Sequence, residues 1–393
     1  MSNPTALYQQ LISHKPQALA QNLWLILPQA SYRLFSNSQN LLNELHDYFV
    51  GQATWQAPND NHPLVTEIYL WQSTDAATLI AATPWEDWLR EAGKSGRKDA
   101  VYDLHFTHGD IRLLHKVKTG MLFVQPSTNN SHDALMAFGP AEQHPNQMIN
   151  FILTQYLNQH LREDWLLGHA AGLQIKGKGL AIAGLSGGGK STLMLQLLED
   201  GEHFISNDRL LFDHLTDTGL SMRGIPKQPR INPGTIVHNS RLHPLMNEQQ
   251  RADFLAMPQE ELRALELKYD APVDKIFWPN CYQGEAKLDY LVILNWQVNS
   301  DQTTSIKQTT LEASPELIPA LMKSPGPFYC SAEGEFLKNG ITPDAETYRQ
   351  RLGEVPVLEL NGKVDFTVAK QLILDTLSPT ESFARDSFTN KNG

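Results

Sequence analysis

Gly184-Leu185-Ser186-Gly187-Gly188-Gly189-Lys190-Ser191 is the stretch of sequence that decides the fold. It matches the pattern GxxxxGK[ST], whose glycines let consecutive backbone N–H groups turn toward a phosphate at the start of a helix. Residues 179–183 before it are small and apolar, as in a buried strand, and residues 193–198 after it favour a helix. A strand, a glycine-rich loop and a helix in this order predict a P-loop.

The residue types of this loop predict its ligand. Lys190 offers a positive charge to the β and γ oxygens of a triphosphate, and Ser191 offers a hydroxyl to Mg²⁺. The sequence therefore predicts binding of ATP together with Mg²⁺. The predicted nucleotide-binding residues are Gly184, Leu185, Ser186, Gly187, Gly188, Gly189, Lys190, Ser191 and Thr192.

An acidic residue follows the predicted loop and its helix closely. Phe204-Ile205-Ser206-Asn207-Asp208 has the form of a short strand that ends in an acid. An isolated run of this kind is more often a turn, but its position soon after the loop favours a metal role. We predict that Asp208 joins Ser191 as a ligand of Mg²⁺.

Composition excludes several function classes. The chain has 393 residues, a formal net charge of −11 and a pI near 5.7, so it has no overall basic field for the phosphates of nucleic acid. Cys281 and Cys330 lie far apart without zinc-ligand spacing or a disulfide framework. The start lacks a signal-peptide pattern, and no apolar run is long enough to span a membrane. We expect a cytoplasmic protein without nucleic-acid or membrane partners.

A chain of this length predicts more than one hydrophobic core. Short β-prone runs, and a helix after the capping cluster at 36–38, indicate a small α+β domain of unknown role over residues 1–140. We predict an α/β P-loop domain over residues 141–378, with a mixed sheet and flanking helices. In this domain, strands are predicted at 210–212, 275–278, 288–296 and 355–360, and helices at 259–267 and 367–377. Residues 379–393 are polar and charged, which predicts a disordered tail.

Features within residues 141–240 together resemble a known family. His169 precedes the strand that enters the loop, residues 186–191 read SGGGKS, Gly201 ends the helix, and Asn207-Asp208 follows at once. In this order they resemble the catalytic domain of HPr kinase/phosphorylase, and more closely the bacterial HPr-kinase-related kinases of the B group. Ordinary P-loop ATPases and GTPases do not place their second acidic element so soon after the helix.

This resemblance implies a kinase that transfers the γ-phosphoryl group of ATP to a hydroxyl acceptor, either a serine of a partner protein or a small molecule. It also implies a homo-oligomer, since HPr kinases form hexameric rings. Members of the B group are associated with an ATP-grasp protein and a small amphipathic Trp-containing protein. The chain departs from the family at Asn207, where the family has the acid that takes the proton of the acceptor hydroxyl, and an amide cannot accept that proton.

Further residues complete the candidate site. His169, beside the strand that enters the loop, is the candidate base, and the alternative is an ordinary surface or capping histidine. Residues 222–234 resemble the corresponding segment of the related kinases, and within them Lys227 and Arg230 are predicted to clamp the transferred phosphoryl group. The alternative for this segment is a proline-stiffened surface turn. The predicted catalytic residues are His169, Lys190, Asp208, Lys227 and Arg230.

Two other functions stay open at this point. A nucleotide-gated binding protein that has lost turnover is the main alternative, because Asn207 replaces an acid. A regulatory GTPase needs the guanine-reading motif NKxD, and the only Asn-Lys pair is Asn390-Lys391, with no Asp after it. The sequence therefore disfavours a GTPase.

Overall fold

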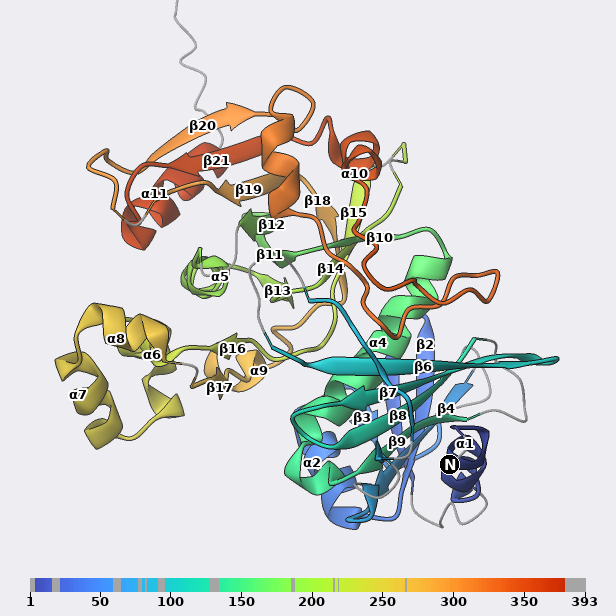
Figure 1. Ribbon diagram of the computed structural model, residues 1–393. Coiled ribbons are helices and arrows are strands. Elements are labelled where there is room, and N and C mark those ends of the chain that lie inside the picture. Colours follow the sequence, from blue (N-terminus) through green and yellow to red (C-terminus); the bar gives the residue numbers. More distant parts are fainter. Residues whose placement is uncertain are drawn as a thin grey trace, which may run out of the picture.

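The structure is a computed structural model that describes residues 4–15, 22–58, 65–76, 80–81, 83–90, 96–127, 134–184, 188–214, 216–217, 219–265, 267–297 and 299–378. Leu185, Ser186 and Gly187 of the predicted loop and the predicted tail over 379–393 lie outside the described residues. The described chain is a mixed α/β structure with several sheets flanked by helices (Figure 1). Within these ranges, no helix has the length and apolar content that crossing a bilayer requires.

The first half of the chain forms a 9-stranded sheet in the order β3-β1-β2-β4-β9-β8-β7-β6-β5. The pairs β2–β4 and β4–β9 are parallel, and the others are antiparallel. Its strands are β1 (Asn22–Leu27), β2 (Ala30–Ser36), β3 (Ala53–Thr54), β4 (Val65–Gln72), β5 (Glu86–Asp87), β6 (Asp99–Phe106), β7 (Gly109–Lys116), β8 (Met121–Pro126) and β9 (Leu135–Gly139). Helices α1 (Pro4–Ile12) and α2 (Gln39–Tyr48) and the short 3₁₀ helix η2 (Ala141–Gln143) accompany it.

Helix α2 begins where the capping cluster predicts. The Ser38 hydroxyl accepts a hydrogen bond from the backbone N–H of Leu41 at 3.1 Å, which satisfies one of the free donors at the helix start. Leu41, Leu42 and Leu45 are fully buried on one face of the helix. The predicted helix is therefore confirmed, with its apolar face on the sheet.

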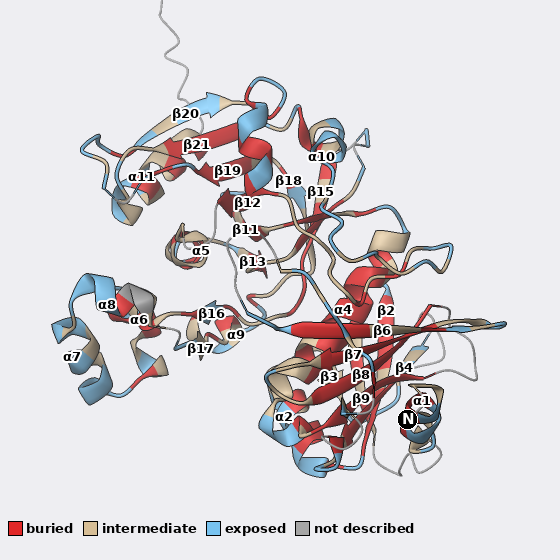
Figure 2. Cartoon of the chain, in the orientation of Figure 1, coloured by how far each residue is buried: buried red, intermediate tan, exposed pale blue. Residues whose placement is uncertain are grey.

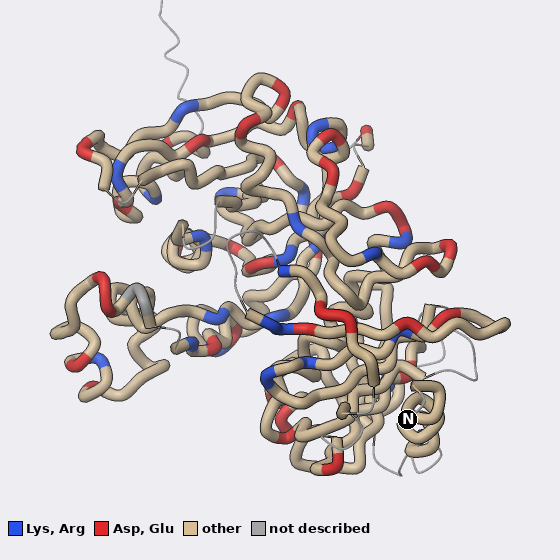
Figure 3. The backbone as a smooth tube through the Cα atoms, in the orientation of Figure 1, with Lys and Arg blue, Asp and Glu red and all other residues tan. Residues whose placement is uncertain are grey.

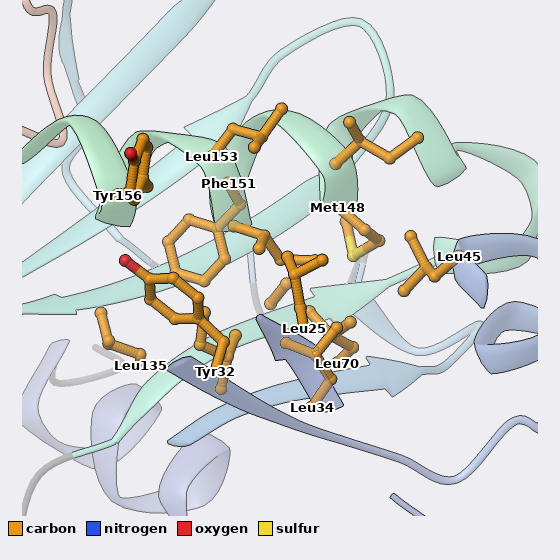
Figure 4. Close-up of a cluster of buried hydrophobic side chains, with 14 of the residues drawn as sticks. Leu25, Tyr32, Leu34, Leu45, Leu70, Leu135, Met148, Phe151, Leu153 and Tyr156 are labelled. Atoms are coloured by element: carbon orange, nitrogen blue, oxygen red, sulfur yellow. The ribbon is translucent and has the colours of Figure 1, made fainter. Parts of the chain in front are cut away.

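Helix α4 (Pro145–Arg162) packs on the same sheet. Met148, Phe151 and Tyr156 share one core with Tyr32 and Leu34 of β2 (Figure 4), and each is at most 1% exposed. In Figure 2, buried residues extend along α4 and along the strands beneath it. Burial of each such side chain contributes about 1.5–3 kcal/mol. The domain boundary near residue 140 stays a prediction, and the helix that follows it packs on the sheet that precedes it.

Helix α4 also contacts the second half of the chain. The Lys227 ammonium donates to Asn150 Oδ1 at 2.6 Å, and Asn158 Nδ2 donates to the backbone carbonyl of Phe328 at 2.7 Å. Helix α4 therefore touches both halves of the molecule.

The second half contains a 6-stranded sheet in the order β13-β11-β12-β19-β21-β20. Strands β12, β19 and β21 are parallel, and their carboxyl ends meet through the register pairs Gly184 with Leu294 and Leu294 with Leu360. In parallel sheets this edge is where ligands bind. Its strands are β11 (Ala170–Ile175), β12 (Lys178–Gly184), β13 (His203–Ser206), β19 (Tyr290–Leu294), β20 (Ser305–Thr309) and β21 (Val357–Asn361), and helices α5 (Lys190–Leu198) and α11 (Phe366–Leu377) pack on it.

A 4-stranded sheet in the order β10-β14-β15-β18 and a 2-stranded sheet β16-β17 complete this half. Their strands are β10 (Leu166–Gly168), β14 (Leu210–Phe212), β15 (Leu220–Arg223), β16 (Arg230–Ile231), β17 (Tyr269–Asp270) and β18 (Glu285–Leu288). The remaining helices are α6 (Pro233–Val237), η3 (Ser240–Leu245), α7 (Glu248–Ala256), α8 (Gln259–Ala264), α9 (Val273–Ile276), η4 (Pro315–Ala320) and α10 (Ala345–Leu352).

One predicted strand is wrong. The sequence predicts extended backbone over residues 275–278, but these residues overlap the single helical turn α9. Pro272 is the N-cap of this turn, and Phe277 and Trp278 after it form an edge-to-face pair at 5.9 Å. A run of four residues that is mostly apolar or aromatic fits a strand or a helical turn equally well. Here the preceding proline and the packing of the two rings favour the helical turn.

Candidate functional site

The candidate phosphate-binding loop joins β12 to α5. Gly184 ends β12, and α5 begins at Lys190 with Gly189 as its N-cap. Gly189 has a φ of 90°, which L side chains rarely adopt, and a Cβ there would lie 2.5 Å from the Phe366 ring. The backbone conformation and the neighbouring ring therefore both require glycine. The first N–H groups of α5 have no acceptor within the helix, so they can donate to another group.

The three residues after the glycines are held in different ways. The Lys190 ammonium donates to the carbonyl of Gly184 at 3.0 Å, so it lies across the ends of the loop. The hydroxyl of Thr192 is 2.9 Å from that of Thr235 in α6, which ties the start of α5 to the helices that follow β16. Ser191 lies between them and is half-buried.

His169 and Asp208 form a hydrogen-bonded pair. His169 follows β10 and Asp208 follows β13, and the ring Nε2 lies 3.1 Å from the carboxylate Oδ1. The backbone N–H of His169 donates to the carbonyl of Leu321 at 2.7 Å, which fixes this residue from a third segment. The side chains are 23% and 43% exposed, so both can be reached from solvent. The structure thus brings together two residues that the sequence singled out separately.

The surroundings of Asp208 favour its charged form. Burial alone would raise the pKa of this carboxyl, but the hydrogen bond from His169 and the positive charges of Lys323 and Arg209 outweigh burial and hold the pKa well below its usual value. Asp208 is therefore an anion at neutral pH. An anion at this position accepts the Nε2–H of His169 and leaves Nδ1 as the basic nitrogen of the ring.

Asn207, which precedes this acid, has a buried Oδ1 with no hydrogen-bond partner among the described residues. An unsatisfied buried oxygen costs about 1–3 kcal/mol. This oxygen is therefore available to a bound group that donates a hydrogen bond or carries a positive charge.

Cations within electrostatic range of Asp208 include Arg209, Lys227 and Lys323. Elsewhere in the described chain, Lys and Arg are interspersed with Asp and Glu (Figure 3). Lys227 lies within electrostatic range of Asp208 and Arg209, and Arg230 forms an ion pair with Asp270 at 3.2 Å. The side chain of Arg209 makes no hydrogen bond or ion pair within the described ranges. Sequence reasoning proposed Lys227 and Arg230 and missed Arg209, whose place directly after the acid was a usable signal.

Sequence reasoning also missed Lys323, because no motif surrounds it. Only the folded structure brings it near Asp208. It lines a cleft of about 260 Å³. Trp165, Tyr329 and Tyr348 form part of its wall. A cleft of this size can hold a large side chain or a small molecule, and Lys323 in its wall lies within electrostatic range of Asp208.

Lys227 is held in a largely dry position. Burial lowers its pKa from 10.5 to about 8, and the charges of Arg209 and Arg230 act in the same direction, while Asp208 and Asp270 oppose them. A small cavity of about 30 Å³ lies beside it. Lys227 can therefore change its charge state near neutral pH.

Protein side chains alone do not build a metal site in the described part of the chain. There, no group of three or more His, Cys, Asp or Glu side chains is arranged to hold an ion, and no hydrogen bond or ion pair joins Ser191 to Asp208. Mg²⁺ commonly keeps several waters and binds one or two protein ligands together with substrate phosphates. The candidate ligands Ser191 and Asp208 fit that second arrangement.

Gly224 sets the path of the segment that carries Lys227. A Cβ at this position would lie 1.8 Å from the backbone carbonyl of Ile205. We expect Gly224→Ala to destabilise the protein by about 1–3 kcal/mol, because backbone would have to move. The check is thermal unfolding, with Gly234→Ala as the control, since a Cβ there meets Leu262 at an ordinary 3.6 Å. Equal melting temperatures for the two variants would contradict the close approach.

Comparisons with known proteins add little to this geometry. No family model matches the chain, and no curated protein matches it in sequence. Among solved structures, the chain is similar to the HPr(Ser) kinase/phosphatase from Coxiella burnetii, with 11% sequence identity and a TM-score of 0.27. The match covers 54% of this chain and 90% of that chain. A likeness at this level carries no argument about function, which therefore rests on the residues themselves.

Proposed function

We propose that the chain is an ATP-dependent phosphotransferase that moves the γ-phosphoryl group to a hydroxyl acceptor, either a serine of a partner protein or a small molecule. One observation carries this proposal: the hydrogen-bonded pair of His169 and Asp208 at 3.1 Å, with the cations Arg209, Lys227 and Lys323 around the acid. An oriented base beside a concentration of positive charge suits phosphoryl transfer, which depends on positioning and charge neutralisation.

The residues present fit a triphosphate with Mg²⁺. Gly189 gives the start of α5 a left-handed backbone, a conformation that turns N–H groups toward an anion, and the buried oxygen of Asn207 has no partner among the described residues. In this proposal residues 184–192 bind the phosphates, and Ser191 and Asp208 hold the metal. The metal would supply positive charge to the phosphate oxygens.

The acid–base pair acts on the acceptor. Asp208 accepts the Nε2–H of His169 and fixes the ring, so Nδ1 is the atom that receives the proton of the acceptor hydroxyl. Asp208 then stabilises the positive ring that forms. Arg209 and Lys227 offset charge that develops on the transferred group, and Arg230 contributes if it exchanges its partner Asp270 for phosphate. A dedicated acceptor protein, a homo-oligomer and a cytoplasmic location are parts of this proposal that rest on the family resemblance and composition.

A nucleotide-gated binding protein without turnover is the second candidate. The observation that favours it is Asn207, an amide at the place of the family's acid. Incubation with γ-labelled ATP, in lysate of the source cell and with the purified protein alone, separates the two. Labelling of a discrete species supports the phosphotransferase. Binding of ATP with no labelled species supports the second candidate, and failure to bind ATP rejects both.

The charge of Lys227 predicts a pH dependence. If its positive form is needed for phosphate, kcat/KM should fall as pH rises above about 8, the pKa of Lys227 in the free protein. Lys227→Arg keeps the charge at higher pH, so its profile should stay level there. The measurement is the pH profile of ATP turnover for both proteins. Identical profiles would show that Lys227 does not act through its charge.

Deprotonation of Lys227 should change stability in the direction opposite to its effect on turnover. Its folded-state pKa is lowered, so between about pH 8 and 10.5 the unfolded chain binds more protons, and stability should rise with pH over that window. Loss of turnover above pH 8 together with unchanged or higher stability therefore separates loss of the charge from unfolding.

A further inference from the structure

Trp296 touches the candidate phosphate-binding loop from outside. It follows β19, the strand that runs parallel to β12, and its indole Nε1–H donates to the backbone carbonyl of Gly188 at 2.9 Å. Trp296 is only 9% exposed. The bond is thus sheltered from water, and it joins the glycine-rich loop to the neighbouring strand.

Phe366 holds the indole in place. The two rings meet edge to face, with centroids 5.1 Å apart and an interplanar angle of 90°. Phe366 is the first residue of α11, and its ring is also the neighbour that leaves no room for a Cβ at Gly189. Trp296 and Phe366 therefore form an aromatic wall against two consecutive glycines.

The bond at Gly188 determines where the next N–H points. In a trans peptide the carbonyl of one residue and the N–H of the next face opposite sides. Because the carbonyl of Gly188 points to Trp296, the N–H of Gly189 points away from Trp296. Gly189 has left-handed backbone angles and Lys190 begins the right-handed helix α5. Consecutive residues of opposite hand turn their N–H groups toward one anion, in the arrangement known as a nest.

We propose that Trp296 is a positioning residue that fixes the peptide between Gly188 and Gly189, so that the N–H groups of Gly189 and Lys190 face a phosphate group of the ligand. The inference rests on the proposed function, because it assumes that this loop binds phosphate. Trp296 acts through the backbone and does not itself touch the ligand. Phosphate affinity then depends on a side chain that lies more than a hundred residues after the loop in sequence.

The test isolates the indole N–H. In one variant, Trp296 is replaced by its isostere β-(3-benzothienyl)alanine, which keeps the ring and has no N–H; the second variant is Trp296→Phe. Binding of inorganic pyrophosphate with Mg²⁺, and of Mg·ATP, is measured by calorimetry below the melting temperature of every variant. We expect both variants to bind pyrophosphate about threefold to tenfold more weakly, the usual effect of one neutral hydrogen bond.

Trp278→Phe is the matched control. Trp278 packs on the same core and has an edge-to-face contact of its own, with Phe277, but makes no hydrogen bond to the loop in the described residues. Its replacement should leave pyrophosphate affinity unchanged. The intrinsic fluorescence gives a second readout: a change on adding pyrophosphate should persist in Trp278→Phe and be lost in Trp296→Phe.

The outcomes separate the inference from the function it rests on. If the wild-type protein binds pyrophosphate and the isostere binds it equally well, Trp296 is only a packing residue and the inference is overturned, while the proposed function stands. If the wild-type protein binds neither pyrophosphate nor Mg·ATP, the proposed function fails and the inference fails with it.

Discussion

Lys190→Ala should lower ATP turnover by at least about a hundredfold, the usual effect of removing a group that stabilises transition-state charge. Mg·ATP affinity should fall as well. The side chain is half-buried and bonds to the carbonyl of Gly184 at 3.0 Å, so its loss removes a cation from the candidate loop without opening the core. The measurements are calorimetric titration with Mg·ATP and the rate of phosphate release or transfer.

Lys178→Ala is the control for this variant. Lys178 stands at the other end of the same strand, β12, and pairs with Asp289 at 3.6 Å. Its loss should leave nucleotide binding unchanged. A Lys190→Ala protein with wild-type affinity and turnover would contradict the assignment of the loop to phosphate binding.

His169→Gln should lower phosphotransfer by about 10²–10⁴-fold, the range that general-base catalysis supplies. Nucleotide binding should persist, because no hydrogen bond or ion pair in the described residues joins His169 to α5. Addition of Asn207→Asp to this variant should recover part of the rate, since it restores a carboxylate at the position where the resembled family has its base. Initial rates with γ-labelled ATP and the acceptor, together with Mg·ATP affinities, measure both effects.

His214→Gln is the matched control for His169. His214 forms a similar pair, with Nε2 at 2.7 Å from Asp164 Oδ2, but both side chains of that pair are exposed. Its replacement should not change the rate. A His169→Gln protein with the wild-type rate would exclude His169 as the base, and the double variant would then show whether the added Asn207→Asp substitution has any effect of its own.

Local patterns predicted the elements around the candidate site, and the contacts between them depended on the fold. The apolar run before Gly184 and the helix after Gly189 were predicted because a strand and a helix are specified by nearby residues. The contact between His169 and Asp208 was not, because it needs two strand ends of different sheets to meet. Lys323 could not be predicted, since it reaches the acid from a segment without a motif.

The error at residues 275–278 has the same origin. Four residues carry too little periodicity to separate a strand from a helical turn, so the tertiary packing of Phe277 and Trp278 decided. The partners of Lys227 and Arg230 also come from distant segments, through Asn150 and Asp270. Sequence reasoning could name these cations but not the groups that hold them.

Helix α4 has a genetic consequence. It completes the core of the 9-stranded sheet with Phe151 and Tyr156, and its Asn150 accepts a hydrogen bond from Lys227. A substitution of a buried core residue of this helix therefore lowers the fraction of folded molecules and leaves the residues of the candidate site in place. In cells, a loss of about 1–2 kcal/mol of stability can change protein abundance several-fold. Alleles that change buried core residues of α4, such as Phe151, should thus lower the amount of protein while the specific activity of the folded molecules stays the same.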